Sequence, residues 1–197
     1  MIFVFDLDDT LCDTDSFSEK YILEFIKKNN LPFKQIASVV RYAEAKFDWD
    51  KETALNWYKT YGDEMMLNFP IKENALEFLN NIKNDGHKII IATARANDWH
   101  SNPEKITKQW LEKNKVPYDK LYIGRADKEL ICKEENADIF VDDDIKITAR
   151  VAEHNKNMKV FLASTPYNKT QEISEKVIRI KNLQEINEKL FNNELSK

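Results

Sequence analysis

Short apolar runs alternate with longer amphipathic segments along most of the chain. The short runs are almost entirely apolar, as strands buried on both faces of a sheet should be, and they predict strands at 2–5, 88–93, 121–123, 139–141 and 159–162. Helical periodicity between these runs predicts helices at 72–84, 103–114, 127–136 and 144–156. We also expect an edge strand at 176–180 and a final amphipathic helix at 182–192. This alternation predicts the α/β class, with a parallel sheet flanked by helices.

One long stretch interrupts the alternation. Between residues 14 and 70 the pattern contains no convincing strand, only helical periodicity at 16–29, 34–46 and 51–61. The stretch is rich in aromatic residues, and most of these rings are expected to form a core for the three helices. We therefore expect a core domain made of residues 1–13 and 71–197, with residues 14–70 inserted as a small helical unit after the first strand.

The composition narrows the classes of function. The 197 residues suit one domain of ordinary size. A net charge of −4 provides no general attraction for a polyanion such as duplex nucleic acid, although it leaves room for a small anionic substrate. Only three glycines occur, Gly62, Gly86 and Gly124, and their spacing excludes both a G-x-G-x-x-G turn and a P-loop.

Cysteine usage and the N-terminal residues bear on the location of the protein. Cys12 and Cys132 belong to no C-x-x-C or Cys/His cluster, so neither a disulfide framework nor a structural zinc site is indicated. The apolar start of the chain ends at Asp6, which is too early for a signal peptide, and no run of about 18 apolar residues follows. These observations favour a reducing, cytoplasmic location without membrane insertion. They give no indication of an oligomeric state.

Polar residues follow several of the predicted strands. The first strand is followed by Asp6-Leu7-Asp8-Asp9-Thr10, the second ends in Thr93, and the strand at 139–141 is followed by the run from Asp142 to Asp144. Lys128 lies between Thr93 and Asp142 in the sequence, at the start of a predicted helix. Each residue alone fits a helix cap, a turn or a solvated side chain. Independent capping does not predict all of them at the carboxyl edge of a parallel sheet, where α/β proteins bind ligands.

These four motifs resemble those of the haloacid dehalogenase superfamily of phosphatases, and the resemblance extends from Ile2 to about Leu162. It implies a Rossmann-like fold in which the helical insertion is a cap that closes over the leaving group. It also implies a phosphomonoester hydrolase in which Asp6 is the nucleophile and forms an aspartyl-phosphate.

The resemblance implies roles for the other motif residues. Asp8 would protonate the leaving oxygen and then deprotonate the attacking water. Thr93 would hydrogen-bond the transferring phosphoryl group. Lys128 would neutralise charge on Asp6 and on the phosphate, with Lys133 as the second candidate for this role.

The resemblance also implies a bound Mg²⁺. A carboxylate can attack an anionic phosphate only if other charges reduce the repulsion, and Mg²⁺ prefers oxygen ligands. The implied ligands are Asp6, the carbonyl of Asp8, and Asp143. Asp142 is either a ligand or a group just outside the ligands. Asp144 is expected to cap the following helix.

Within the superfamily, five runs look like the cytosolic 5′(3′)-deoxyribonucleotidase type: 93–95, 107–111, 116–121, 127–128 and 139–143. That family holds its nucleobase between aromatic rings of the cap, which makes a nucleoside monophosphate the expected substrate. The candidate rings, each with core packing as the alternative, are Phe17, Tyr42, Phe47 and Trp49. Arg95 is expected to contact phosphate or sugar, with a solvent-exposed arginine as the alternative, and Trp99 and His100 lie in the loop after it.

One position departs from the nucleotidase pattern. Asp8 is followed by Asp9 and Thr10, where the nucleotidases commonly have glycine and valine. Other substrates therefore stay open, namely a sugar phosphate or another small phosphoester, or the 3′-phosphate end of a polynucleotide; a nucleic-acid partner is otherwise not expected. A phosphotransferase is a further alternative, because an alcohol could replace water. The intact Asp6 argues against a non-catalytic phosphate-binding module.

Overall fold

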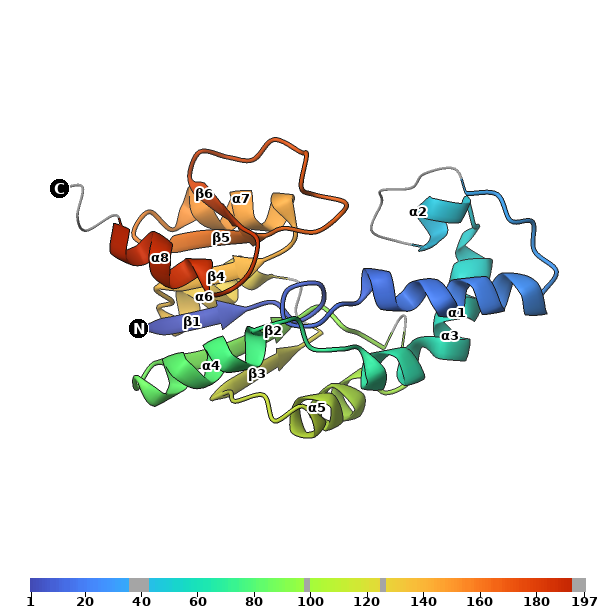
Figure 1. The fold of residues 1–197 in the computed structure, drawn as a ribbon, viewed down its shortest axis with the longest axis horizontal. Coiled ribbons are helices and arrows are strands. Elements are labelled where there is room, and N and C mark those ends of the chain that lie inside the picture. Colours follow the sequence, from blue (N-terminus) through green and yellow to red (C-terminus); the bar gives the residue numbers. More distant parts are fainter. Residues whose placement is uncertain (36–42, 98–99, 125–126, 193–197) are drawn as a thin grey trace.

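The computed structural model describes residues 1–35, 43–97, 100–124 and 127–192. Six parallel strands form one sheet in the order β3-β2-β1-β4-β5-β6 (Figure 1). Their bounds are β1 Ile2–Phe5, β2 Lys88–Thr93, β3 Lys120–Ile123, β4 Ile139–Asp142, β5 Lys159–Ala163 and β6 Val177–Ile180. The five strands predicted from apolar runs are confirmed, and so is the edge strand at 176–180.

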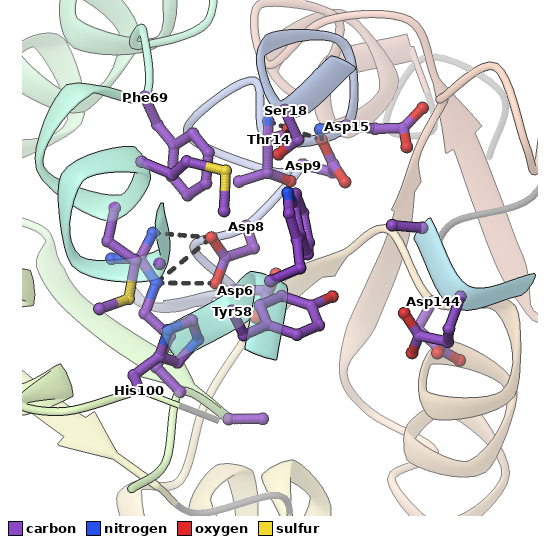
Figure 2. A pocket seen from close by; sticks show the side chains of 18 of the residues that line it. Asp6, Asp8, Asp9, Thr14, Asp15, Ser18, Tyr58, Phe69, His100 and Asp144 are labelled. Carbon is purple, nitrogen blue, oxygen red and sulfur yellow. Dashed lines mark hydrogen bonds and ion pairs between the residues drawn. The ribbon is translucent and has the colours of Figure 1, made fainter. Parts of the chain in front are cut away.

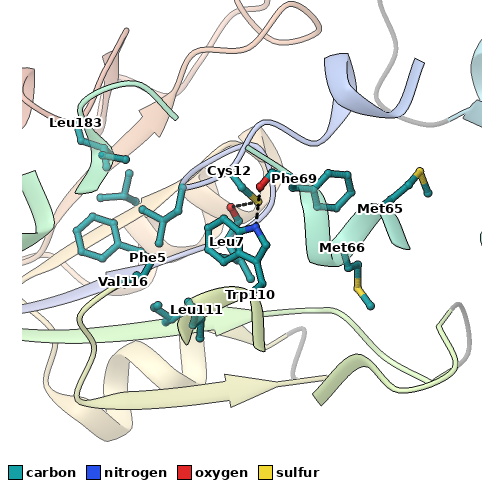
Figure 3. Close-up of a cluster of buried hydrophobic side chains, with 14 of the residues drawn as sticks. Phe5, Leu7, Cys12, Met65, Met66, Phe69, Trp110, Leu111, Val116 and Leu183 are labelled. Atoms are coloured by element: carbon teal, nitrogen blue, oxygen red, sulfur yellow. Dashed lines mark hydrogen bonds between the residues drawn. The ribbon is translucent and has the colours of Figure 1, made fainter. Parts of the chain in front are cut away.

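Alternate residues along a strand point to opposite faces of the sheet, so apolar strands present apolar side chains on both faces. Helices cover both of these faces. On one face, Phe3 and Phe5 join a hydrophobic cluster with α4 (Ala75–Asn84), α5 (Pro103–Lys113) and α8 (Glu185–Asn192), part of which Figure 3 shows. On the other face, Val4 belongs to a cluster with α6 (Lys128–Glu135) and α7 (Ile145–His154). The result is the predicted Rossmann-like α/β fold.

Local sequence signals account for several helix ends. Helix α4 stops shortly before Gly86, whose φ of +79° lies in the left-handed region that favours glycine. Pro103 begins α5, where its missing N–H leaves no hydrogen bond unmade. The Asp144 carboxylate caps α7, as predicted, by accepting the N–H groups of Lys146 (2.8 Å) and Ile147 (3.0 Å). No helix in the described ranges is both long and apolar enough to cross a bilayer.

Among the described residues, three helices lie between β1 and α4, beyond the carboxyl ends of the strands (Figure 1). They are α1 (Asp15–Lys28), α2 (Ala43–Phe47) and α3 (Lys51–Asn68). Helix α1 matches the prediction at 16–29. The prediction at 34–46 is met only at its end by α2, since residues 34 and 35 are not helical and 36–42 lie outside the described residues. Helix α3 begins as predicted but continues seven residues beyond position 61.

The longer α3 has a physical cause. Gly62 in a helix interior costs about 1 kcal/mol relative to alanine, which made a helix end near this position plausible from the sequence. One turn later, however, Met65 and Met66 are only 2% and 1% exposed, and burying their side chains offsets that cost. The helix ends at Asn68 because Pro70 disfavours the helical conformation at Phe69.

The aromatic residues of these helices pack largely against one another. The ring centroids of Tyr21 on α1 and Tyr61 on α3 are 5.5 Å apart, and both rings are buried. The indole N–H of Trp110 on α5 donates to the carbonyl of Phe69 (2.7 Å), which connects the end of α3 to α5 (Figure 3). Within the described part of the chain, most rings therefore form a core, as expected.

Candidate active site

The order of the strands reverses next to β1, because the chain continues to β2 and β3 on one side and to β4, β5 and β6 on the other. Such a reversal leaves a crevice at the carboxyl ends of the two central strands. Asp6 follows β1 and Asp142 ends β4, and the backbone N–H of Asp6 donates to the carbonyl of Val141 (2.9 Å). Carboxylate oxygens of Asp6, Asp142 and Asp143 all lie within 4.8 Å of one another, and the three residues are buried. The structure thus brings three of the expected residues together.

Lys128 joins this cluster as the first residue of α6, whose N-terminus is capped by Asp127. Its ammonium contacts the Asp6 carboxylate and lies 2.7 Å from Asp142 Oδ2, and the residue is 2% exposed. Burial alone would lower the pKa of Lys128, but the carboxylates of Asp142 and Asp6 outweigh burial and raise this pKa above its ordinary value. Lys133, by contrast, is exposed and pairs with Glu129 (2.6 Å), so it does not reach the site.

Arg95 holds the carboxylate of Asp8. Its Nε lies 2.9 Å from Asp8 Oδ2, its Nη2 lies 2.7 Å from Asp8 Oδ1, and Figure 2 shows these contacts converging on Asp8. The guanidinium also donates to Thr107 (3.3 Å), and Arg95 is 6% exposed. Burial by itself would lower the pKa of Arg95, but the attraction of Asp8 raises it overall. Arg95 is therefore not a surface arginine but an ion-pair partner of Asp8, and its contact with phosphate or sugar stays a prediction.

Thr93 ends β2 beside this ion pair. Its hydroxyl lies 3.5 Å from Asp8 Oδ2 and accepts the backbone N–H of Arg95 (3.3 Å). Thr93 is fully buried. It lies at the strand end, as the sequence predicts.

Asp9 explains the departure from the nucleotidase pattern. Its φ of +55° lies in the left-handed region, where glycine is favoured and aspartate is tolerated. Its Oδ1 accepts the backbone N–H groups of Thr14 (2.9 Å) and Asp15 (3.0 Å), while the Thr14 side chain makes no capping hydrogen bond. Asp9 thus caps α1 from outside the helix, a role that glycine could not fill.

Two residues of the β5–β6 connection also reach the site, and the sequence reasoning missed both. The Tyr167 hydroxyl contacts Asp143 Oδ2 and lies 3.1 Å from Asp9 Oδ2. Asn168 donates to the carbonyls of Asp143 and Ala163, both at 2.8 Å. The available signal was that Thr165-Pro166-Tyr167-Asn168 begins two residues after the end of β5, at the same sheet edge as the acidic motifs.

A cavity of about 440 Å³ borders the carboxylates. Asp6, Asp8 and Lys128 line it on the side of the sheet, and Figure 2 shows Tyr58, His100 and Phe69 around Asp8. The helices contribute a largely apolar wall that includes Ile22, Trp57, Tyr58, Met65, Met66 and Phe69. Burial, followed by the charge of Arg95, lowers the pKa of His100, so this ring is neutral at pH 7.

Polar groups of α1 and α2 complete the lining of the cavity. Lys46 lies 3.8 Å from Asp15, and both side chains are largely buried. Burial raises the pKa of Asp15 to about 6, against the opposing attraction of Lys46. Glu44 Oε2 and Trp57 Nε1 are also buried and make no hydrogen bond within the described structure.

Three of the four aromatic residues expected to stack on a nucleobase lie away from the cavity. Phe17, Phe47 and Trp49 do not line the cavity; they pack within the hydrophobic cluster of the helices, where Phe47 stacks on Trp49 at 5.7 Å between centroids. Tyr42 and Trp99 lie outside the described residues. Phe17, Phe47 and Trp49 therefore pack in the core, which was the alternative considered for these rings.

The donor set fits a magnesium ion. Asp6, Asp142 and Asp143 offer carboxylate oxygens, the ligands that Mg²⁺ prefers. Around the site, five carboxylates (Asp6, Asp8, Asp9, Asp142 and Asp143) meet three basic side chains (Lys72, Arg95 and Lys128). The formal charge of these eight described side chains is therefore about −2, which a divalent cation would neutralise.

Comparisons with known proteins agree with this geometry. The model of the haloacid dehalogenase-like hydrolase family matches residues 1–146. No curated protein sequence matches the chain significantly.

Solved structures share the fold over nearly the whole chain. A haloacid dehalogenase-like family hydrolase from Streptococcus pneumoniae is 13% identical, with 95% of this chain and 97% of that chain covered and a TM-score of 0.66. A protein described as a predicted phosphatase from Clostridium acetobutylicum is 18% identical, with 97% and 98% covered and a TM-score of 0.67. YfnB from Bacillus subtilis, described as a HAD-hydrolase bound to magnesium, is 10% identical, with 96% and 97% covered and a TM-score of 0.65. At these identities the likeness supports the fold alone.

Proposed function

Because the chain belongs to the haloacid dehalogenase-like hydrolase family, we propose that it is a magnesium-dependent phosphomonoester hydrolase that acts through an aspartyl-phosphate on Asp6. One observation carries the proposal: the Lys128 ammonium contacts both Asp6 and Asp142 in a buried site, with Asp143 within reach of both carboxylates. The proposed chemistry requires a nucleophile, a cation and a set of oxygen ligands close together, and this arrangement supports the proposal.

The first half of the reaction transfers the phosphoryl group to the enzyme. A carboxylate oxygen of Asp6 bonds to phosphorus, and the bond from phosphorus to the leaving oxygen breaks. Asp8 donates a proton to that oxygen, so that the product leaves as a neutral alcohol. Lys128 neutralises part of the charge on Asp6 and on the phosphoryl group, to which Thr93 donates a hydrogen bond. Asp8 must be protonated before this step, so the contact that Arg95 makes with both of its oxygens orients the carboxylate form, which acts in the second half.

The second half regenerates the enzyme. Asp8, now a carboxylate, takes a proton from water, the water oxygen bonds to phosphorus, and the bond between phosphorus and Asp6 breaks to release inorganic phosphate. Bound Mg²⁺ supplies positive charge at the phosphoryl oxygens. Asp6, the carbonyl of Asp8, and Asp143 would hold the ion. Asp142 would lie just outside the ligands, since its two oxygens accept from Lys128 (2.7 Å) and from the N–H of Asp144 (2.8 Å).

Residues 14–70 would serve as the cap over a core made of residues 1–13 and 71–197. This division is supported by the cavity, whose lining comes from the sheet edge on one side and from α1, α2 and α3 on the other. A leaving group attached to a phosphate at Asp6 would therefore contact the helices.

A nucleoside monophosphate is the proposed substrate. The apolar wall and the rings of Trp57, Tyr58 and Phe69 suit a planar base better than a sugar with hydroxyls on every side. The buried Glu44 Oε2 can accept a hydrogen bond and the buried Trp57 Nε1 can donate one, and a nucleobase edge carries both kinds of partner. Trp57, Tyr58 and Phe69 are thus proposed to contact the base, in place of Phe17 and the other rings expected from the sequence.

A panel of phosphate-release assays tests the proposal. Nucleoside monophosphates, sugar phosphates and a 3′-phosphorylated oligonucleotide are compared with Mg²⁺ and with chelator, with Asp6→Asn as the inactive control. We expect kcat/KM for the best nucleotide to exceed that for the best sugar phosphate by about tenfold or more. We expect no turnover in chelator. Preference for a sugar phosphate would contradict the substrate class, and activity of Asp6→Asn would contradict the nucleophile. Product analysis with an added alcohol separates hydrolysis from phosphotransfer.

A further inference from the structure

Tyr167 lies on the β5–β6 connection, yet its hydroxyl is part of the acidic site. The residue is 8% exposed, and the hydroxyl contacts Asp143 Oδ2 while lying 3.1 Å from Asp9 Oδ2. A tyrosine hydroxyl carries a single hydrogen, and a carboxylate only accepts. The hydroxyl can therefore donate to only one of these two carboxylates at a time.

The main chain that carries Tyr167 is held in place from several sides. The Asn168 side chain donates to the carbonyls of Ala163 and Asp143 (both 2.8 Å), and its Oδ1 accepts the N–H of Thr165 (2.9 Å). Arg179 on β6 donates to the carbonyl of Asn168 (3.1 Å). Asn168 is 1% exposed, so these bonds are shielded from water. The hydroxyl of Tyr167 is therefore presented to Asp143 from a fixed frame.

We infer that Tyr167 is a positioning residue of the metal site, whose hydrogen bond holds the Asp143 carboxylate within reach of Asp6 and Asp142. The inference rests on the proposed function, in which Asp143 is a Mg²⁺ ligand. Hydrogen bonds from residues outside the ligands fix the orientation of ligand side chains, and their loss typically weakens metal binding by about 10- to 100-fold. Tyr167 acts through Asp143 and touches neither the ion nor the substrate.

Calorimetric titration of the full-length, metal-free protein with Mg²⁺ tests the inference without any substrate. The variant Tyr167→Phe removes one oxygen and keeps the ring, and Tyr118→Phe, at a residue 39% exposed, is the matched control. We expect Tyr167→Phe to raise the Kd for Mg²⁺ by about tenfold or more, and the control to change it by less than about twofold. A purely structural role would lower the Tm in chelator and leave the Kd unchanged.

The outcomes separate this inference from the proposed function. Equal Mg²⁺ affinity in wild type and Tyr167→Phe, with wild type binding the ion, would overturn the role of Tyr167 and leave the hydrolase proposal intact. Absence of Mg²⁺ binding in wild type would overturn both.

Hydrogen–deuterium exchange of the wild type provides a second test that does not depend on the folding of a variant. The backbone N–H groups of Asn168 and Lys169 donate to the carbonyl of Thr165 (3.3 and 3.0 Å), so their exchange reports on the frame of Tyr167. If Tyr167 links this frame to the ion through Asp143, Mg²⁺ should slow exchange in a peptide covering residues 164–171. Unchanged exchange at saturating Mg²⁺ would contradict the link.

Discussion

Replacing Lys128 with methionine removes a buried charge while nearly preserving the length of the side chain. Lys128 is 2% exposed, and its ammonium lies against Asp6 and 2.7 Å from Asp142 Oδ2. Two buried carboxylates then lose their shared cation. Breaking a buried ion pair from one side typically costs about 3–5 kcal/mol, because the remaining charge is left uncompensated.

The loss of unfolding free energy has an upper limit, because the variant can instead protonate one of the two carboxylates. For a carboxyl group of ordinary pKa, protonation costs about 5 kcal/mol at pH 7.5 and about 2 kcal/mol at pH 5.5. We therefore expect Lys128→Met to lower the free energy of unfolding by about 3–5 kcal/mol at pH 7.5 and by about 2 kcal/mol at pH 5.5.

The charge of Lys128 itself does not vary across this range. The carboxylates of Asp142 and Asp6 raise its pKa despite the opposing effect of burial. A raised lysine pKa gives stability that is fully present below the unfolded pKa of about 10.4 and is lost only as the pH rises through the folded pKa. The pH dependence of the difference between variant and wild type therefore reports on the carboxylates.

Urea denaturation in chelator, at both pH values, measures the effect. Lys133→Met is the matched control, because Lys133 is half exposed and pairs with Glu129 on its own helix, so it should cost no more than about 0.5 kcal/mol. Added Mg²⁺ should stabilise Lys128→Met more than wild type, since the ion replaces the missing positive charge. If Lys128→Met were as stable as Lys133→Met at pH 7.5 in chelator, Lys128 would not be the cation that compensates Asp6 and Asp142.

Three further predictions concern the cavity. Arg95→Lys loses the two-pronged contact with Asp8, so steady-state kinetics should show a roughly 10- to 100-fold lower kcat with little change in KM; a higher KM at unchanged kcat would instead make Arg95 a substrate contact. Tyr58→Leu should lower kcat/KM for nucleotides by about 5- to 150-fold and spare p-nitrophenyl phosphate, whereas Phe17→Leu should show no such selectivity; equal losses on both substrates would refute base contact. Because burial raises the pKa of Asp15 to about 6, its ionisation opposes folding as the pH rises from about 4 to 6, and Asp15→Asn should raise the Tm at pH 8 but not below about pH 4; identical melting curves at pH 8 would contradict this.

The strands and most helices are predictable from the sequence because their signals are local. A strand buried on both faces must be apolar throughout, and the runs at 2–5 and 139–141 satisfy this condition. The meeting of Asp6 with Asp142 is predictable for the same reason, since both follow strands of one parallel sheet and such strands end at the same edge. The full length of α3 was not predictable from the sequence, because the burial of Met65 beyond Gly62 depends on contacts made by other segments.

Local sequence patterns do not show which distant side chains of the candidate site pair with one another. Arg95 pairs with Asp8 across 87 positions, although its proximity to Thr93 suggested a phosphate contact. Tyr167 reaches Asp9 across 158 positions and carries no motif of its own. Likewise, aromatic content alone does not show which rings face the cavity: Trp57, Tyr58 and Trp49 all pack in the same hydrophobic cluster, but only the first two line the cavity.

The central claim, that Asp6 carries the phosphoryl group, is tested most directly by trapping the intermediate. The variant Asp8→Asn is mixed with p-nitrophenyl phosphate and Mg²⁺, treated with borohydride, and digested for peptide mass spectrometry. Nitrophenolate leaves without a proton, so the first half of the reaction persists in this variant, while the second half lacks its base and the aspartyl-phosphate accumulates. We predict a burst of nitrophenol equal to the enzyme concentration and conversion of Asp6 to homoserine. A burst of nitrophenol with Asp6 unmodified would contradict the account.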